Sequence, residues 1–244
     1  MTTRPYRHWL AQLQIRWRAY WLLKGIGITA CITLFMAVYF ALLRHPQHAV
    51  TVMPLVALDH WVGFVPWAVW PYASLWLYIG IAPGLLLLRS EMWRYLLAVI
   101  LVATIGCGIF YFWPTMVPEF ALDWSRWPVL NLIKSTDATG NACPSLHVAF
   151  AVLTAIWLQQ VLREVRAPRS LHAVNLAWCV LIVWSTMATR QHVAVDVGAG
   201  VLLGAGVTLA SLKLLPGVAV APPRAATVEW NASDGTSGNG GVNS

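Results

Sequence analysis

The sequence contains few charged residues. Asp, Glu, Lys and Arg together account for 10% of its 244 residues, compared with about 25% in a soluble domain. Hydrophobic residues account for 59%, compared with roughly 45–50% in a soluble domain. These proportions exclude an ordinary soluble protein and indicate an integral membrane protein. The 15 tryptophans agree with this interpretation, because Trp is enriched where a membrane meets water.

Cysteine is scarce as well. The four cysteines, Cys31, Cys107, Cys143 and Cys179, are too far apart to indicate a disulfide framework or a CxxC metal site. Three of them fall inside predicted membrane spans, and only Cys143 lies beside residues that could carry chemistry. The net charge of +7 is not gathered in one basic run. We therefore expect the bilayer, and not nucleic acid, as the partner of the basic residues.

Six segments are apolar and long enough, or nearly long enough, to cross a membrane as helices. A hydrocarbon core of about 30 Å requires roughly 20 apolar residues in a helix. The six segments are residues 25–43, 66–88, 95–113, 145–161, 172–189 and 195–214. The sequence therefore predicts an all-α integral membrane protein, with a six-transmembrane helix bundle over residues 25–215.

The two ends of the chain differ from this membrane domain. Residues 1–24 mix arginine with aromatic and aliphatic residues, which is typical of an amphipathic helix in the headgroup layer. No A-x-A-like cleavage site follows the first apolar run, so we expect a retained anchor rather than a signal peptide. Residues 216–244 are rich in Gly, Ser and Pro and have too little apolar surface to fold alone. We predict a disordered cytoplasmic tail there.

The distribution of Lys and Arg predicts the orientation of the bundle. With six spans and a cytoplasmic N-terminus, twelve basic residues fall on the cytoplasmic side and four on the other, as the positive-inside rule requires. The four are Arg44, Arg126, Lys134 and Arg190. We therefore expect a multi-pass protein, as in a bacterial inner membrane, with both termini cytoplasmic. The stretches NACPSLHVAF (residues 141–150) and STMATRQHVAVDVGAG (residues 185–200) then lie together on the outer, periplasmic face.

His192 and Asp196 are candidate catalytic residues in the second of these stretches. Ionisable side chains at the edge of a span are costly to desolvate, so they usually face a protein interior or a wet cavity. Because residues four apart share one face of a helix, a helix here would place the Asp196 carboxylate beside the His192 ring. The carboxylate would fix the tautomer of the ring and leave its other nitrogen as a nucleophile or base.

Ser145 and His147 are candidates in the first stretch. Residues two apart point roughly 200° away from each other on a helix, so these two can share a target only at a helix start. We expect Pro144 to supply that start, because proline is favoured in the first turn. The free N–H groups of residues 145–147 and the positive end of the helix dipole would then face a bound anion.

Other polar residues complete a possible phosphate site. Arg190 places a permanent cation on the outer face, Lys134 and Arg126 could add positive charge, and Asn141 is a further candidate substrate-binding residue. Two histidines, a carboxylate, a serine and a helix N-terminus indicate phosphoryl transfer through a phosphohistidine. Acyl transfer fits less well, because no general base stands beside a Ser or Cys. Each feature alone could also be structural, as a helix cap, a turn or a headgroup anchor.

The same residues resemble a known family. PSLH (residues 144–147) and the stretch from Ser185 to Asp196 are similar to the second and third signature motifs of the type 2 phosphatidic acid phosphatase superfamily, PSGH and SRxxxxxHxxxD. The resemblance implies a six-helix membrane fold in which His192 attacks phosphorus and Asp196 orients this histidine. It further implies that His147 protonates the leaving oxygen and that Ser145 holds the phosphoryl group. Ser185 matches the first serine of the third motif and is counted with the substrate-binding residues.

The sequence departs from the family motifs in three ways. The first family motif, KxxxxxxRP, is absent, and Thr186 stands where the third motif has arginine. Both differences remove cations that bind phosphate in the family, and we expect Arg190, with Lys134 or Arg126, to replace them. Leu146 stands in place of the motif glycine, which is more similar to the inositolphosphotransferase branch. That branch includes inositol phosphorylceramide synthases and passes the phosphoryl-bearing group from a phospholipid to an alcohol.

These patterns predict an enzyme that needs no cofactor and no metal. It would be a lipid phosphatase or phosphotransferase acting on a phospholipid or lipid phosphate, with water or another alcohol as the acceptor. A non-catalytic lipid-binding or transport protein on the same fold is the alternative, favoured by the missing first motif. A metal site is a third interpretation: His147, His192 and Asp196 are obvious donors, but the paired histidine boxes of membrane di-iron enzymes are missing.

Overall fold

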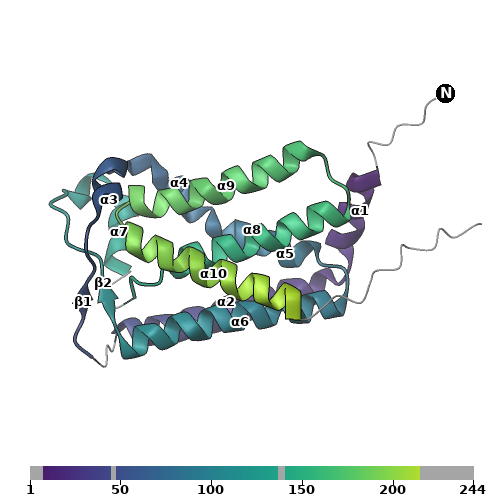
Figure 1. Ribbon diagram of the computed structural model, residues 1–244, viewed down its shortest axis with the longest axis horizontal. Helices are drawn as coiled ribbons and strands as arrows, with labels where there is room; N and C mark the ends of the chain where they lie inside the picture. Colours follow the sequence, from purple (N-terminus) through teal and green to yellow (C-terminus); the bar gives the residue numbers. More distant parts are fainter. Residues whose placement is uncertain (1–7, 45–47, 137–140, 215–244) are drawn as a thin grey trace, which may run out of the picture.

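The apolar segments fold as helices that run side by side along one direction of the molecule (Figure 1). The computed structural model describes residues 8–44, 48–136 and 141–214. Within these ranges, five helices are long and apolar enough to cross a membrane. They are α2 (Trp21–Arg44), α6 (Arg89–Phe112), α8 (Leu146–Glu164), α9 (Arg169–Ala188) and α10 (Ala194–Leu214). The prediction of an all-α membrane fold is confirmed, and five of the six predicted spans are long helices.

The remaining predicted span, residues 66–88, is not one continuous helix. It forms the 3₁₀ turn η2 (Pro66–Ala68) and the helices α4 (Val69–Ala73) and α5 (Leu75–Leu85). The Ser74 hydroxyl donates to the Pro71 carbonyl at 2.7 Å, which occupies the acceptor that the Leu75 amide would use in an unbroken helix. Pro83, within α5, has no N–H to donate to the turn before it. The segment is apolar throughout, but these side chains interrupt its hydrogen bonding.

α8 lies at the centre of the bundle, in contact with α5, α6, α9 and α10. α10 approaches it through two glycines four residues apart, Gly200 and Gly204. A Cβ at Gly200 would lie 2.5 Å from the Ser145 carbonyl oxygen, and a Cβ at Gly204 would collide with the Ala149 carbonyl. Small residues at this spacing let membrane helices pack backbone against backbone. The contact therefore fixes the start of α10 against the start of α8.

The short elements gather at one end of the bundle, on the left of Figure 1. β1 (Thr51–Val52) pairs in parallel with β2 (Thr115–Met116), with Thr51 opposite Thr115, and Thr115 also forms a bridge to Asn141. The helices α3 (Ala57–Val62) and α7 (Pro128–Thr136) and the 3₁₀ turn η3 (Trp124–Arg126) also lie here. Because α8 and α10 begin at this end and α9 finishes at it, both motif stretches meet here. We call it the motif end.

The opposite end carries α1 (His8–Arg18), on the right of Figure 1, and we call it the basic end. Arg16 is buried there, and its Nη2 donates to Glu164 Oε2 at 3.1 Å. The Lys24 ammonium donates to the carbonyls of Arg16 at 2.7 Å and of Gly84 at 2.8 Å. These bonds attach α1 to the bundle, while its predicted place in the headgroup layer stays a prediction. Residues 1–7 and the predicted tail, 216–244, lie outside the described residues.

Candidate active site

The first motif stretch forms the N-terminus of α8. Ser145 is the N-cap, and its Oγ accepts a hydrogen bond from the Val148 N–H at 3.3 Å. α8 starts at Leu146, so Ser145 and His147 do stand at a helix start, as predicted. Pro144 lies one residue before the cap and not in the first turn, because the serine side chain closes the helix end. The Leu146 and His147 N–H groups open the first turn, where amides have no acceptor within the helix.

Thr115 holds the chain that leads into α8. The Cys143 N–H donates to Thr115 Oγ1 at 2.7 Å, and the Ala142 N–H donates to the Thr115 carbonyl at 3.0 Å. Since β2 follows α6, these bonds tie the start of α8 to the end of α6. Burial raises the pKa of the Cys143 thiol to about 11, and the charge of Asp196 contributes to the rise. This thiol stays protonated at neutral pH and is not the nucleophile.

His192 lies before α10 and not on it. The four-residue spacing had predicted that His192 and Asp196 share a helical face. Because α10 begins at Ala194, they do not. Instead, Asp196 Oδ2 accepts a hydrogen bond from the Val193 N–H at 3.0 Å and closes the start of α10. The same oxygen lies 3.6 Å from His192 Nδ1, which is longer than a hydrogen bond. The ring and the carboxylate therefore face each other, but through a turn.

The two motif stretches meet where α8 and α10 begin. The Ser145 N–H donates to the Asp196 carbonyl at 3.0 Å. The His192 N–H donates to the Thr186 carbonyl at 3.1 Å, which holds the turn between α9 and α10. His147 and His192 line one cavity, together with Asn141. The structure thus brings the two predicted histidines to one space, and it joins their supporting residues by a direct hydrogen bond.

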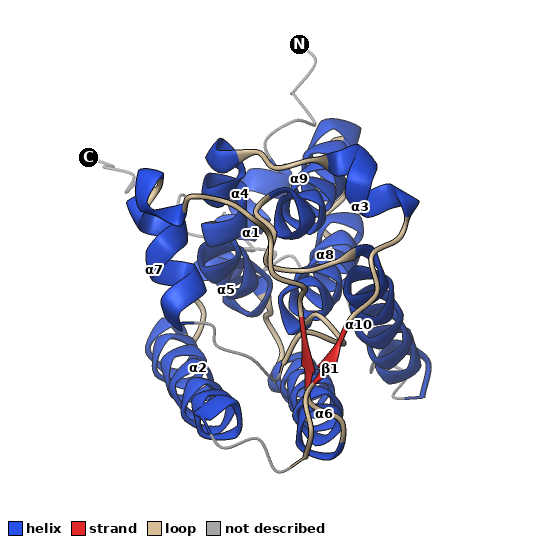
Figure 2. Cartoon of the chain, turned by 90° about the vertical axis from the view of Figure 1, so that its left-hand side faces the viewer, coloured by secondary structure: helices blue, strands red, loops and turns tan. Residues whose placement is uncertain are grey.

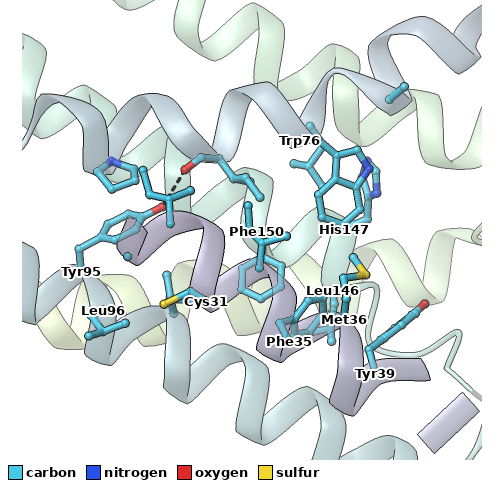
Figure 3. A pocket seen from close by; sticks show the side chains of 18 of the residues that line it. Cys31, Phe35, Met36, Tyr39, Trp76, Tyr95, Leu96, Leu146, His147 and Phe150 are labelled. Atoms are coloured by element: carbon cyan, nitrogen blue, oxygen red, sulfur yellow. Dashed lines mark hydrogen bonds between the residues drawn. The ribbon is translucent and has the colours of Figure 1, made fainter. Parts of the chain in front are cut away.

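Tyr72 orients the ring of His147. The two rings are stacked, with centroids 4.0 Å apart and planes inclined by 16°. His147 Nε2 lies 3.0 Å from the Tyr72 carbonyl oxygen, and a carbonyl at this distance requires the nitrogen to carry a proton. Figure 3 shows His147 and Trp76 among the side chains that line the cavity. Tyr72 belongs to the interrupted segment, and no pattern in the sequence marks it as part of a site.

Arg190 is anchored beside the cavity and does not line it. Its Nη1 donates to the Asp59 carbonyl at 2.9 Å, and its guanidinium carbon lies 4.7 Å from the centre of the Phe120 ring. Burial lowers the pKa of Arg190, whereas the charge of Asp59 raises it. The Asp59 carboxylate is itself buried, and it accepts hydrogen bonds from the Ala194 N–H at 2.8 Å and the Val56 N–H at 2.9 Å. Asp59, which no motif marks, therefore fixes both Arg190 and the start of α10.

Most of the predicted substrate-binding residues do not line the cavity. Lys134 Nζ lies 5.9 Å from the centre of the Trp124 ring. Ser185 is fully buried, and its hydroxyl donates at 2.6 Å to a carbonyl one turn earlier in α9. Among the described residues that line the cavity, Asn141 is present, but Ser145, Lys134, Ser185 and Arg190 are not.

Leu146, which replaces the glycine of the resembled motif, packs against a glycine of α6. A Cβ at Gly106 would lie 3.0 Å from Leu146 Cγ and 3.1 Å from Cδ1, and closer still to Cδ2. Leu146 is buried and also lines the cavity. The missing side chain at Gly106 therefore makes the room that the large side chain at Leu146 needs.

This arrangement can bind an anion and move a proton beside it. Two imidazoles face one cavity, one near a buried carboxylate and the other at a helix N-terminus, where the dipole and open N–H groups favour an anion. Such a pair suits nucleophilic attack by one ring and proton donation by the other. In the described ranges, no group of three or more His, Cys, Asp or Glu side chains is placed to hold a metal ion.

A known family matches the larger part of the chain. The family model described as the PAP2 superfamily matches residues 91–218, just over half of the chain. The matched range includes both motif stretches and the helices α6, α8, α9 and α10, whereas Asp59 and Tyr72 lie before it. No curated protein and no solved structure gives a significant match to the chain.

Proposed function

The chain belongs to the PAP2 superfamily, and from this membership and the geometry of the site we propose that it is a membrane phosphatase or phosphotransferase. Its substrate would be a lipid phosphate or a phospholipid. The observation that carries the proposal is the meeting of the two histidines: His147 and His192 come from separate motifs and line one cavity. The hydrogen bond from the Ser145 N–H to the Asp196 carbonyl supports the same pairing.

In the first chemical step, an imidazole nitrogen of His192 attacks phosphorus. The Asp196 carboxylate lies near His192 Nδ1, so it favours a proton on that nitrogen and leaves Nε2 as the nucleophile. A bond forms between Nε2 and phosphorus while the bond from phosphorus to the leaving oxygen breaks. His147, protonated on both ring nitrogens, keeps its Nε2 proton on the Tyr72 carbonyl and gives its Nδ1 proton to the leaving oxygen, which departs as an alcohol. The product on the protein is a phosphohistidine.

In the second step, an acceptor hydroxyl resolves the phosphohistidine. His147, now without the proton it gave away, takes the proton of the incoming water or alcohol. The acceptor oxygen bonds to phosphorus, and the bond from phosphorus to His192 breaks. Water as the acceptor gives hydrolysis, and another alcohol gives transfer. The resemblance to the inositolphosphotransferase branch favours transfer from a phospholipid to an alcohol.

The phosphoryl oxygens would be held chiefly by the start of α8. The Leu146 and His147 N–H groups point from the positive end of this helix, and Ser145 and Asn141 stand beside them. Arg190 is the nearest permanent cation we assign to the site, and Lys134 is a second. Arg190 is bonded to the Asp59 carbonyl, and Lys134 lies over the Trp124 ring. We therefore expect both to attract the phosphate by their electrostatic field and not by direct contact.

We place the motif end on the periplasmic side of a bacterial inner membrane, with both termini in the cytoplasm. The basic residues support this orientation. At the basic end, where α1 lies and where α2, α6 and α9 begin, stand Arg16, Lys24, Arg89 and Arg169, among other basic residues. At the motif end stand Arg44, Arg126, Lys134 and Arg190. The positive-inside rule then puts the basic end in the cytoplasm.

The test is to incubate the purified protein with lipid phosphates and phospholipids, with and without inositol or ceramide as acceptor. Release of free phosphate would show hydrolysis, and a new phospholipid would show transfer. We expect His147→Asn to lower kcat by about 10²- to 10⁴-fold, which is the usual contribution of a positioned acid. We expect His192→Asn to lower kcat further and to abolish acid-labile phosphate on the protein.

The matched control is His60→Asn, because His60 is an exposed histidine next to Asp59 at the same end. It should behave as wild type. Binding of lipid without any turnover in wild type would instead support the non-catalytic lipid-binding alternative. Full activity of His192→Asn would overturn the mechanism.

A further inference from the structure

The cavity that holds the two histidines continues far beyond them. Its volume is about 950 Å³. Its functional polar groups lie at the motif end, where His147, His192 and Asn141 line it. From there it extends to Leu23 and Lys24, at the start of α2, which lie at the basic end. The catalytic groups therefore occupy one end of a much longer space.

The walls of this space are apolar and come from different helices. α2, α5 and α6 supply aliphatic and aromatic side chains along its length, and α8 adds Phe150. Figure 3 shows His147 and Trp76 at one end of the drawn region and Tyr95 and Leu96 at the other, with Phe150 between them. Between Asn141 and the histidines at one end and Lys24 and Arg89 at the other, an interior of this kind suits hydrocarbon and offers little to a polar ligand.

The length of the cavity exceeds one leaflet of a membrane. Along α2 it is lined from Leu23 to Phe40, which at 1.5 Å per residue corresponds to about 26 Å. Half of a hydrocarbon core is about 15 Å. An occupant that fills the cavity from the histidines onward therefore reaches past the middle of the bilayer.

The lining of the cavity selects the kind of occupant. The cavity is continuous with the space at the two histidines and is mostly apolar between its ends. A molecule that joins a phosphate headgroup to a hydrocarbon chain therefore matches it along its length.

α2 is placed so that a chain can enter from the side. Figure 2, which looks onto the motif end, shows α2 at the edge of the bundle. Only 6% of its most apolar stretch is buried inside the protein, compared with 61% for α8. A helix held this loosely borders the lipid, so the cavity behind it can exchange with the bilayer.

We propose that this cavity binds the hydrocarbon chain of the substrate lipid, which runs along α2 from His147 toward Lys24, so that the enzyme favours lipids with long chains. The proposal rests on the proposed function, because it is the substrate headgroup that sits at the histidines. Lys24 lines the far end of the cavity, and its ammonium donates to the carbonyls of Arg16 and Gly84. A chain that reaches it has passed Gly27 and Cys31, which both line the cavity.

The glycines of α2 provide a matched test. Gly27 lines the cavity, and a Cβ added there would meet nothing within 4 Å. Gly25 has the same open surroundings but does not line the cavity. Gly27→Phe would therefore fill the space beyond the middle of the bilayer, whereas Gly25→Phe adds the same side chain on another face of α2.

The measurement compares kcat/KM on dioctanoyl and distearoyl forms of phosphatidate and phosphatidylinositol in mixed micelles. We expect wild type and Gly25→Phe to prefer the distearoyl lipids. In Gly27→Phe the ratio of distearoyl to dioctanoyl activity should fall by about tenfold, because the new side chain overpacks the part of the cavity that only the longer chain reaches. An unchanged ratio in an active Gly27→Phe variant overturns the chain site and leaves the proposed function standing.

A photolabelling experiment tests the chain site even if the protein shows no catalytic turnover. Phosphatidate with a photoreactive diazirine at the end of a stearoyl chain should label residues around Gly27 on α2 and Met92 on α6, and distearoyl phosphatidate should compete. Such labelling without turnover supports the chain site while the proposed function fails. Labelling only on the outer faces of the helices, or labelling that distearoyl phosphatidate does not displace, overturns the chain site.

Discussion

A single methyl group on α6 should disturb the active site through the contact between Gly106 and Leu146. In Gly106→Ala, the new Cβ would lie 3.0 Å from Leu146 Cγ and 3.1 Å from Cδ1, whereas non-bonded carbons prefer about 3.5–4.0 Å. Leu146 is buried, with 4% of it exposed, and the free space beside it is the cavity that it lines, so it can yield only toward the substrate site. Its backbone directly follows the Ser145 cap. The strain therefore falls on the first turn of α8, which carries His147.

The expected size of the effect follows from this geometry. Overpacking a buried site by one methyl group costs about 1–3 kcal/mol of stability. For a protein of this length, that loss lowers the melting temperature by roughly 2–12 °C. Because His147 would move with the strained turn, kcat on a lipid substrate should fall by about 10- to 100-fold, the usual effect of a misplacement approaching 1 Å.

A double-mutant cycle separates this contact from general damage. Leu146→Ala alone should cost about 2–5 kcal/mol because it leaves a cavity. In the Gly106→Ala background that space is partly filled, so the combined loss should be smaller than the sum by about 1–3 kcal/mol. Thermal unfolding of the protein in detergent, followed by tryptophan fluorescence, measures the losses. Gly108→Ala is the matched control, since a Cβ there meets nothing within 4 Å. Additive losses, or a Gly106→Ala variant as stable as Gly108→Ala, would refute the reasoning.

Three further substitutions test the supporting residues. Asp196→Asn keeps an oxygen for the Val193 N–H but removes the charge near His192, so kcat in initial-rate assays should fall by about 10²- to 10⁴-fold; an unchanged kcat would separate the carboxylate from catalysis. Cys143→Ser should keep wild-type activity, and iodoacetamide at neutral pH should not inactivate wild type, because the Cys143 thiol has a pKa of about 11. Asp59→Ala leaves two backbone N–H groups without their acceptor, so the melting temperature should fall by several degrees while Asp59→Asn recovers part of the loss.

Hydropathy predicted the long helices well because a helix in lipid must be apolar along its whole length. It could not distinguish residues 66–88 from a continuous span, since that segment is equally apolar. The interruptions occur at single positions, where the Ser74 hydroxyl donates to the Pro71 carbonyl and where Pro83 has no N–H. Composition averaged over 20 residues does not register a side chain that competes with the backbone at a single position.

The spacing of the motifs predicted which residues meet, but not how they are held. Asp196 was expected to face His192 across a helical turn, and it instead caps α10 from within and faces His192 across a loop. Asp59 and Tyr72 support the site from segments before α5, through contacts that join residues far apart in the chain. Local periodicity has no information on such contacts, because it depends only on neighbours in the sequence.

The departures from the family motifs have different physical consequences. The larger side chain of Leu146 fits into the space left by the missing side chain at Gly106, so the start of α8 stays in place. Thr186 is not compensated in the same way. It is fully buried, its hydroxyl donates to the Val183 carbonyl at 2.8 Å, and its own carbonyl accepts the His192 N–H. Thr186 therefore holds the nucleophile His192 in place and supplies no charge to the phosphate.

A site with fewer cations should favour a substrate with less negative charge. A phosphate monoester such as phosphatidate carries up to two negative charges near neutral pH, whereas a phosphodiester headgroup such as that of phosphatidylinositol carries one on its phosphate. The start of α8 contributes about half a positive charge, which balances the diester better than the monoester. We therefore expect kcat/KM to be higher for phosphatidylinositol than for phosphatidate with the same chains, and the difference to shrink as salt screens the charges. A clear preference for phosphatidate would show that Arg190 or Lys134 reaches the phosphate directly during turnover.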